Sequence, residues 1–130
     1  MEFLREAIPE TGVRIPAFLQ GKPRAVKPII RDQLFLIARE AIFNALRHSR
    51  ATKVEVELEY LRSSLSMSVR DNGCGFNPDT VQEAGNSHRG LRGMRARAET
   101  INAQFEIWSR PRAGTEVRVK VRTDVAIAPE

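Results

Sequence analysis

Apolar and polar residues alternate along four stretches of the chain, and this period of two is typical of strands that bury one face. The stretches are residues 53–61, 64–69, 104–109 and 115–122. Glutamates separate the apolar positions of the first stretch, serines separate those of the second, and arginine or lysine separates those of the last. The pattern therefore predicts two strand pairs, one joined around Arg62 and Ser63 and the other across residues 110–114.

A period near 3.6 residues predicts helices in two other segments. Residues 28–49 carry a helically spaced apolar stripe made of Ile30, Leu34, Ile37, Ala38, Ala41 and Ala45. Pro28 suits the first turn, because its missing N–H would have no partner there. Residues 91–102 form the second expected helix. Residues 71–89 are rich in Gly, Asn, Asp and Ser, and a loop of that length is usually functional.

The two ends of the chain carry weaker patterns. Residues 3–8 are typical of the end of a helix and residues 13–19 of a short edge strand, since prolines are tolerated at edges. Residues 123–130 are expected to form a flexible tail. A sheet that is wet on one face needs helices on the other, so the sequence predicts a two-layer α/β sandwich. Residues 1–27 would supply its edge strand and residues 28–122 its core.

The composition favours one soluble domain. Of the 130 residues, 42% are hydrophobic and 28% charged, and a domain of this length can bury a core without disulfides or metals. Cys74 is the single cysteine, so no internal disulfide forms, which favours a reducing, cytoplasmic compartment. No apolar run approaches the roughly 18 residues of a membrane span, and residues 1–6 lack the pattern of a signal peptide.

The formal net charge of +5 suits a polyanionic ligand. Nucleic acid, a lipid surface and a nucleoside triphosphate all meet that description, and a basic but otherwise inert surface explains the same charge. The basic residues alternate with acidic ones and form no dense block. Charge alone therefore leaves the partner open.

A row of polar residues borders the apolar stripe of the long helix. At about 100° per residue, Glu40, Asn44 and His48 fall on one line, and Asn44 is a poor helix former. Such a row is typical of a pocket floor, although plain surface polarity would produce it too.

Three glycine-containing segments follow. Residues 71–76 (Asp-Asn-Gly-Cys-Gly-Phe) end a strand, where glycines let a flat ligand approach and a carboxylate can accept a hydrogen bond; a plain Asn-Gly turn is the alternative. Gly90 and Gly93 begin a helix, whose free N–H groups suit phosphate, although many helices begin after glycine. Gly114 and Thr115 lie at the start of the last strand, where a simple hairpin turn is the default explanation.

In this order and on these elements, the segments resemble the ATP-binding catalytic domain of bacterial sensor histidine kinases. Residues 39–49 resemble the N box of that family, residues 71–76 its G1 box, residues 90–94 its G2 box, and Gly114-Thr115 its last conserved turn. The similarity covers about residues 28–122 and looks most like the subfamily of nitrate sensors and the thermosensor DesK. It implies the Bergerat fold, with a mixed, mostly antiparallel sheet of about five strands covered on one face by about three helices.

The resemblance also implies ATP and Mg²⁺ as cofactors and assigns roles by position. Asn44 would bind Mg²⁺ between the phosphates, since an oxygen ligand suits that cation. Glu40 would be the catalytic residue, acting as a base or polarising the attacking histidine. Arg47 would contact phosphate, and His48 would line the edge of the pocket. Asp71 would bind the adenine amino group.

The remaining implied ATP contacts are Gly73, Gly75, Gly90, Leu91, Gly93, Met94 and Thr115. Gly73 and Gly75 would shape the adenine wall, and residues 90–93 would hold phosphate at the hinge of an ATP lid formed by residues 77–89. Arg89 departs from the family pattern, because related sequences often carry a bulky apolar or aromatic residue before the G2 glycine.

No two-helix hairpin precedes residue 28, so we expect the phosphorylated histidine to lie outside this chain, and neither His48 nor His88 fits that role. The isolated chain would then bind ATP without phosphorylating itself. The implied partners are the dimerisation and phosphoacceptor domain of the same protein and a response regulator. Neither nucleic acid nor direct membrane contact is expected, although the whole protein could be a membrane-bound sensor.

Two alternatives stay open at this point. A serine kinase of the anti-sigma-factor type has the same fold and would act as an ATP-dependent regulatory binding module. A basic nucleic-acid module would use Arg118, Lys120 and Arg122, but that face offers few aromatic side chains on which bases could stack. The sequence favours the histidine kinase domain.

Overall fold

The computed structural model describes residues 15–47, 50–75 and 89–129. Its strands are β1 (Ala17–Gln20), β2 (Val54–Tyr60), β3 (Ser64–Asp71), β4 (Gln104–Ser109) and β5 (Thr115–Arg122). Its helices are α2 (Pro28–Arg47), α4 (Arg89–Thr100) and the short α5 (Thr123–Ala126). The predicted helix at residues 3–8 and the first residues of the predicted edge strand lie outside the described residues.

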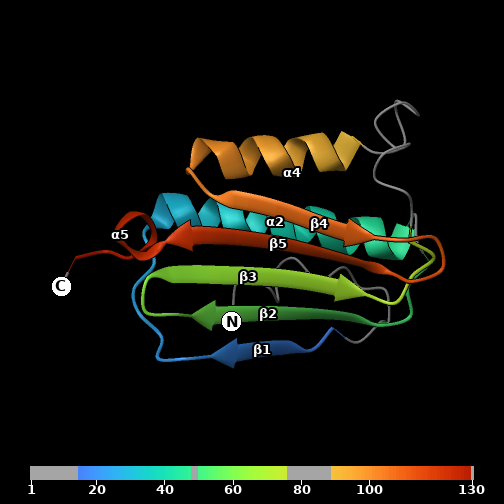
Figure 1. Cartoon of the computed structure of the whole chain (residues 1–130), viewed down its shortest axis with the longest axis horizontal. Helices are drawn as coiled ribbons and strands as arrows, with labels where there is room; N and C mark the ends of the chain where they lie inside the picture. Colours follow the sequence, from blue (N-terminus) through green and yellow to red (C-terminus); the bar gives the residue numbers. More distant parts are fainter. Residues whose placement is uncertain (1–14, 48–49, 76–88, 130) are drawn as a thin grey trace.

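The five strands form one sheet in the order β1-β2-β3-β5-β4. β1 and β2 are parallel, because α2 carries the chain back across the sheet between them, and the other pairs are antiparallel. In Figure 1, α2 crosses behind the sheet, and α4 packs against α2 and β4. The predicted two-layer sandwich with a mixed, mostly antiparallel sheet is confirmed.

The core lies between α2 and the apolar face of the sheet. The stripe predicted for α2 is buried in full, together with Ile42. Val56 of β2 and Val119 of β5 have no exposed surface, and α4 adds Met94 and Ala98 at helical spacing. In the part of the chain described, no helix is both long and apolar enough to span a membrane.

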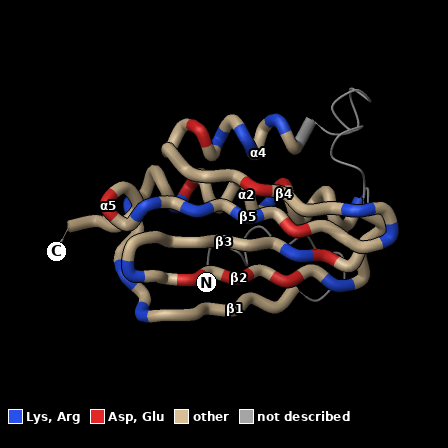
Figure 2. The backbone as a smooth tube through the Cα atoms, viewed as in Figure 1, with Lys and Arg blue, Asp and Glu red and all other residues tan. Residues whose placement is uncertain are grey.

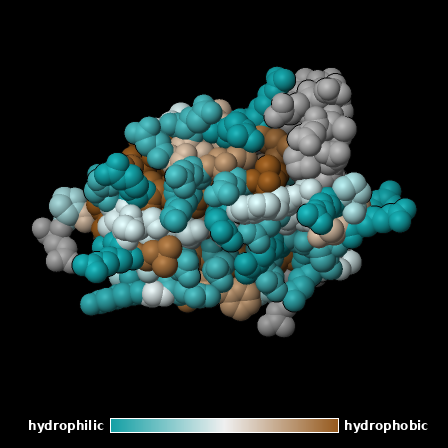
Figure 3. All heavy atoms as spheres, viewed as in Figure 1, coloured by the Kyte–Doolittle hydropathy of each residue, from teal (hydrophilic) through white to brown (hydrophobic). Residues whose placement is uncertain are grey.

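The opposite face of the sheet differs from the prediction at β3. The alternation predicts that Ser64, Ser66 and Ser68 face water, yet all three are buried. The strands beside β3 carry long charged side chains at the paired positions; Glu57 and Arg118, for example, flank Ser68. These longer neighbours cover the small hydroxyl groups. Figures 2 and 3 show the resulting charged, mostly hydrophilic face.

The end of the chain, expected to form a flexible tail, contains the helical turn α5, which contacts β3 and β5 and is hydrogen-bonded to the segment that leads into α2. Ala126 of α5 is fully buried. Lys27 donates its backbone N–H to the Ala126 carbonyl at 2.8 Å, and Ala128 donates to the Ala25 carbonyl at 2.8 Å. A single helical turn is too short to show a hydrophobic period, so the sequence pattern did not reveal it.

We predict that a chain ending at Arg122 is less stable than the full chain by about 2–3 kcal/mol. Each lost hydrogen bond contributes roughly 1 kcal/mol, and the neighbours of Ala126 lose part of their burial. Urea unfolding followed by circular dichroism measures the difference. A chain ending at Ala128 keeps both hydrogen bonds and serves as the control, so equal stability of the two shortened chains would contradict the assigned contacts.

Candidate functional site

Five of the residues singled out in the sequence line one narrow cavity between the helices and the sheet. Asn44 comes from α2, Asp71 ends β3, Thr115 begins β5, and Leu91 and Met94 come from α4. The remaining walls are apolar and consist of Ala41, Val69, Ile107 and Val117. The cavity measures about 20 Å³, the space of about one water molecule. Three polar groups thus converge on an apolar space that residues far apart in the sequence enclose.

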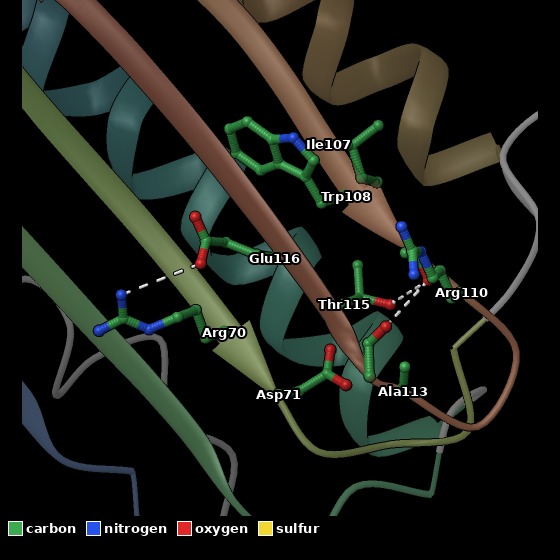
Figure 4. Close-up of a pocket in the computed structure, with 10 residues that line it drawn as sticks. Arg70, Asp71, Ile107, Trp108, Arg110, Ala113, Thr115 and Glu116 are labelled. Carbon is green, nitrogen blue, oxygen red and sulfur yellow. Dashed lines mark hydrogen bonds and ion pairs between the residues drawn. The ribbon is translucent and has the colours of Figure 1, made fainter.

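Asp71 is the most constrained polar group of this cavity. Its Oδ1 accepts the Gly73 N–H at 2.8 Å, which forms an Asx turn, and Figure 4 shows the side chain at the tip of β3 near Thr115. Burial raises the pKa of Asp71 above its ordinary value, and the hydrogen bonds from the Gly73 and Thr115 backbone lower it by less. A carboxylate has about four acceptor positions, so this group can still accept hydrogen bonds from a ligand.

The Asp71 loop is held by the hairpin between β4 and β5. Gly75 and Gly114 both have positive φ, +64° and +79°. A Cβ on Gly75 would lie 2.0 Å from the Arg110 carbonyl oxygen, and one on Gly114 would lie 2.2 Å from the Asp71 carbonyl oxygen. Only glycine therefore allows this close backbone contact, which is a structural role for Gly75 in addition to any role at a ligand.

Glu40 lies in a separate groove on the outer side of the helices. This groove, of about 360 Å³, runs between α2 and α4 and is lined by Leu36, Arg39, Glu40, Phe43, Gly93, Met94 and Arg97. Met94 borders both the groove and the narrow cavity, so the two spaces lie on either side of one side chain. A Cβ added to Gly93 would meet nothing within 4 Å. Packing within the described part of the chain therefore gives no reason for glycine at this position.

The side chain of Arg47 packs over an aromatic ring of the same helix. Its guanidinium lies 4.9 Å from the centre of the Phe43 ring, and that of Arg39 lies 5.3 Å from the same ring. Cation–π contacts of this kind hold exposed arginines with modest energy. They keep two positive charges over Phe43, which lines the same groove as Glu40.

Some of the predicted site residues cannot be placed. His48 and residues 77–88 of the expected lid lie outside the described residues, and for Arg89 and Gly90 only the backbone of α4 is described. Other residues contribute to the site but carry no recognisable signal in the sequence pattern. The apolar cavity walls are ordinary core positions in the pattern, and Asn72 looked like half of an Asn-Gly turn, although its partners lie twenty positions earlier in the chain.

A larger hollow, of about 510 Å³, lies at the hairpin end of the sheet (Figure 4). It is lined by Arg70, Asp71, Ile107, Trp108, Ser109, Arg110, Ala113, Gly114, Thr115 and Glu116. It shares Asp71, Ile107 and Thr115 with the narrow cavity, but it contains no residue of α2 or α4. The polar row of α2 therefore identifies the narrow cavity and its neighbouring groove as the candidate site.

The described residues contain no group of three or more His, Cys, Asp or Glu side chains that could hold a metal by themselves. The Asn44 amide oxygen is a ligand type that a hard cation accepts. A cation at this position would need most of its ligands from water or from a bound anion, which is how Mg²⁺ is commonly held beside phosphates.

A family model described as histidine kinase-, DNA gyrase B- and HSP90-like ATPase matches residues 29–125. Over 91 residues the chain is 48% identical to the sensor protein VraS of Staphylococcus saprophyticus and to that of Staphylococcus haemolyticus. Each alignment covers 70% of this chain and 25% of the relative. The chain thus spans about a quarter of the length of these curated relatives.

Solved structures agree with the observed fold. The histidine kinase domain of the blue-light-activated histidine kinase of Erythrobacter litoralis EL346 superposes with a TM-score of 0.65 at 20% identity, covering 92% of this chain and 59% of that one. A longer structure of the same protein gives a TM-score of 0.68 at 18% identity, covering 92% and 38%. At these identities the similarity is one of fold.

We predict that Asp71→Asn leaves the unliganded protein as stable as the wild type at pH 7, or more stable. A raised pKa means that the ionised Asp71 is disfavoured in the folded state, so its ionisation lowers stability above that pKa. Below the ordinary aspartate value of 3.8 the group is protonated in both states and the effect vanishes. Unfolding midpoints measured from pH 4 to 8 should show an advantage of the variant that grows with pH. A variant that is less stable at pH 7 would refute the prediction.

Proposed function

This chain belongs to the family of histidine kinase-, DNA gyrase B- and HSP90-like ATPases, and from that premise we propose that it is the ATP-binding catalytic domain of a sensor histidine kinase. One observation carries the proposal: Asn44, Asp71 and Thr115 converge from three elements on a cavity closed by Leu91 and Met94 of α4. A hydrogen-bonding carboxylate inside an apolar slot suits a flat base, and an amide oxygen at the slot's edge suits a cation beside phosphates.

Adenine would lie in the narrow cavity. The Asp71 carboxylate retains acceptor capacity after its two backbone hydrogen bonds, and the adenine amino group is a donor that matches it. Ala41, Val69, Ile107 and Val117 would contact the two faces and edge of the base. A base does not fit into about 20 Å³, so α4, which supplies Leu91 and Met94, would have to move away from the sheet when ATP binds.

The phosphates would lie along α2, beside Asn44. Mg²⁺ bound there would neutralise phosphate charge, with Asn44 as a protein ligand. The open space at Gly93 would leave the backbone of α4 accessible to the phosphate chain. Arg47 is held close by Phe43 and would turn toward phosphate at little cost, because a cation–π contact at an exposed site is worth roughly 0.5–1 kcal/mol.

Glu40 would act at the far end of the phosphates, in the groove between α2 and α4. A histidine imidazole entering this groove would form a bond from one ring nitrogen to the γ-phosphorus while the bond from that phosphorus to the bridging oxygen breaks and ADP leaves. The Glu40 carboxylate would accept a hydrogen bond from the other ring nitrogen, orient the ring and, as general base, take up the proton of that nitrogen as the new bond forms. Transfer of this kind depends mainly on positioning and charge stabilisation.

The acceptor histidine of this proposal lies on the dimerisation domain of the same protein, and a response regulator would take the phosphoryl group from it. Both partners would act in the cytoplasm. A serine kinase of the same fold would leave phosphoserine instead, which survives acid, whereas phosphohistidine survives base and is lost in acid. Chemical stability of the labelled product therefore distinguishes the two functions.

We predict that ATP binding requires Mg²⁺ and depends on Asp71. Calorimetry with a non-hydrolysable ATP analogue should give heat that decreases when Mg²⁺ is removed. GTP should bind poorly, because its base has a carbonyl where adenine has the amino donor. Asp71→Asn should weaken ATP binding about ten- to a hundredfold, since a mismatched buried hydrogen bond costs about 1–3 kcal/mol. Asp124→Asn, on the distant α5, is the matched control. No heat from folded protein at millimolar ATP would refute the function, and equal ATP and GTP affinities would refute the assignment of Asp71.

We predict that Glu40 accelerates phosphoryl transfer and contributes little to nucleotide affinity. When an acceptor domain is supplied, Glu40→Ala should slow transfer by about 10²–10⁴-fold, the usual range for a general base, with ATP affinity nearly unchanged. Asn44→Ala should weaken ATP and Mg²⁺ binding together. Glu99→Ala, an exposed position of α4, controls for loss of a glutamate. Rates are followed with labelled ATP, and transfer by Glu40→Ala at the wild-type rate would exclude Glu40 as the base.

A further inference from the structure

Asn72 joins two loops that follow α2 and β3, the elements that carry Asn44 and Asp71 of the candidate site. Its Oδ1 accepts the backbone N–H groups of Thr52 and Lys53 at 3.0 and 2.9 Å. Its Nδ2 donates to the Thr52 hydroxyl at 2.9 Å, and its own N–H donates to the Lys53 carbonyl at 3.2 Å. One side chain thus makes three hydrogen bonds to a segment twenty residues away, and the two N–H donors define which way its amide faces.

The segment held by Asn72 is continuous with the end of α2. Ala51 donates its N–H to the carbonyl of Ala45 in the last turns of that helix at 2.9 Å, and Arg50 has a positive φ of 52°. Consecutive N–H groups of residues 51, 52 and 53 are therefore used by α2 and by Asn72. The link runs from the turns of α2 that carry Asn44 directly to the loop that carries Asp71.

These hydrogen bonds are exposed to solvent, which limits their contribution to the stability of the fold. Both Asn72 and the backbone at Thr52 and Lys53 are accessible to solvent. Water can replace an exposed partner with little loss of stability. Water cannot reproduce the fixed distance between the two loops, so the contribution of Asn72 is mainly geometric.

We propose that Asn72 is a positioning residue that sets the distance and orientation between the adenine subsite at Asp71 and the phosphate subsite at the end of α2. This inference rests on the proposed function and adds a residue to it. A nucleoside triphosphate has to satisfy both subsites at once, whereas AMP uses mainly the first and tripolyphosphate mainly the second. Loss of this relative position would therefore weaken the binding of ATP more than the binding of either fragment. Joining two fragments raises affinity only when the geometry of their two sites matches that of the joined ligand.

The test compares ATP, AMP and tripolyphosphate, each with Mg²⁺, by calorimetry and by amide chemical shifts for the weaker ligands. Asn72→Ala should weaken ATP binding at least about fivefold while AMP and tripolyphosphate change less than about twofold. Its melting temperature should stay near that of the wild type. Asn72→Asp keeps an acceptor for both N–H groups and for the Thr52 hydroxyl, and should restore most of the ATP affinity. Gln20→Ala removes an exposed hydrogen bond between strands far from the site and should have no effect.

Several outcomes would overturn the proposal. Wild-type ATP affinity in folded Asn72→Ala excludes a positioning role, and so does an Asn72→Asp variant that is folded but binds as poorly as Asn72→Ala. An equal loss for ATP and AMP would mean that Asn72 acts on the adenine subsite alone. If Asn72→Ala does not fold, Thr52→Val decides, because it removes only the hydroxyl partner; an unchanged ratio of ATP to AMP affinity then overturns the proposal. Failure of the wild type to bind ATP would instead refute the proposed function.

Discussion

Helix α2 buries one face against the sheet, and this packing organises the whole domain. Seven side chains of this helix are buried, from Ile30 to Ala45, and apolar burial is the dominant favourable term in folding. The orientation that buries this stripe also determines where its polar neighbours lie. Glu40 and Asn44 sit at the margin of the stripe, so they face α4 and the end of β3. The packing that stabilises the domain therefore positions the chemical groups of the site.

The loop after β3 is held from two sides. On one side Gly75 and Gly114 allow backbone contact with the β4–β5 hairpin, at separations that a Cβ would prevent. On the other side Asn72 bonds to the turn after α2. Asp71 lies between these contacts and is half-buried, so burial raises its pKa. A buried carboxylate with spare acceptor capacity costs stability in the empty protein, and this cost is typical of a group kept for binding.

The face of the sheet opposite α2 is covered by charged side chains of its own strands. There Ser66 and Ser68 of the central strand are paired with glutamates of β2 on one side and with arginine or lysine of β5 on the other (Figure 2). Arg70 reaches Glu55, Glu57 and Glu116 at 3.8–3.9 Å. Long side chains lean over short ones, so a strand that alternates in sequence is buried on both faces. The hydrophilic character of this face in Figure 3 comes from its flanking strands.

The long helices, most of the strands and the residue types of the site could be predicted from the sequence, because hydrophobic period, helix starts and glycine turns are local properties of the chain. Asn44, Asp71 and Thr115 are site residues predicted from the sequence, and they line one cavity in the structure. Other features depend on neighbours that are distant in sequence and become apparent in the folded protein. Asn72 bonds to residues 52–53, the β3 serines are covered by adjacent strands, and α5 with its buried Ala126 contacts β3 and β5. Each of these depends on packing between elements, which a local pattern does not encode.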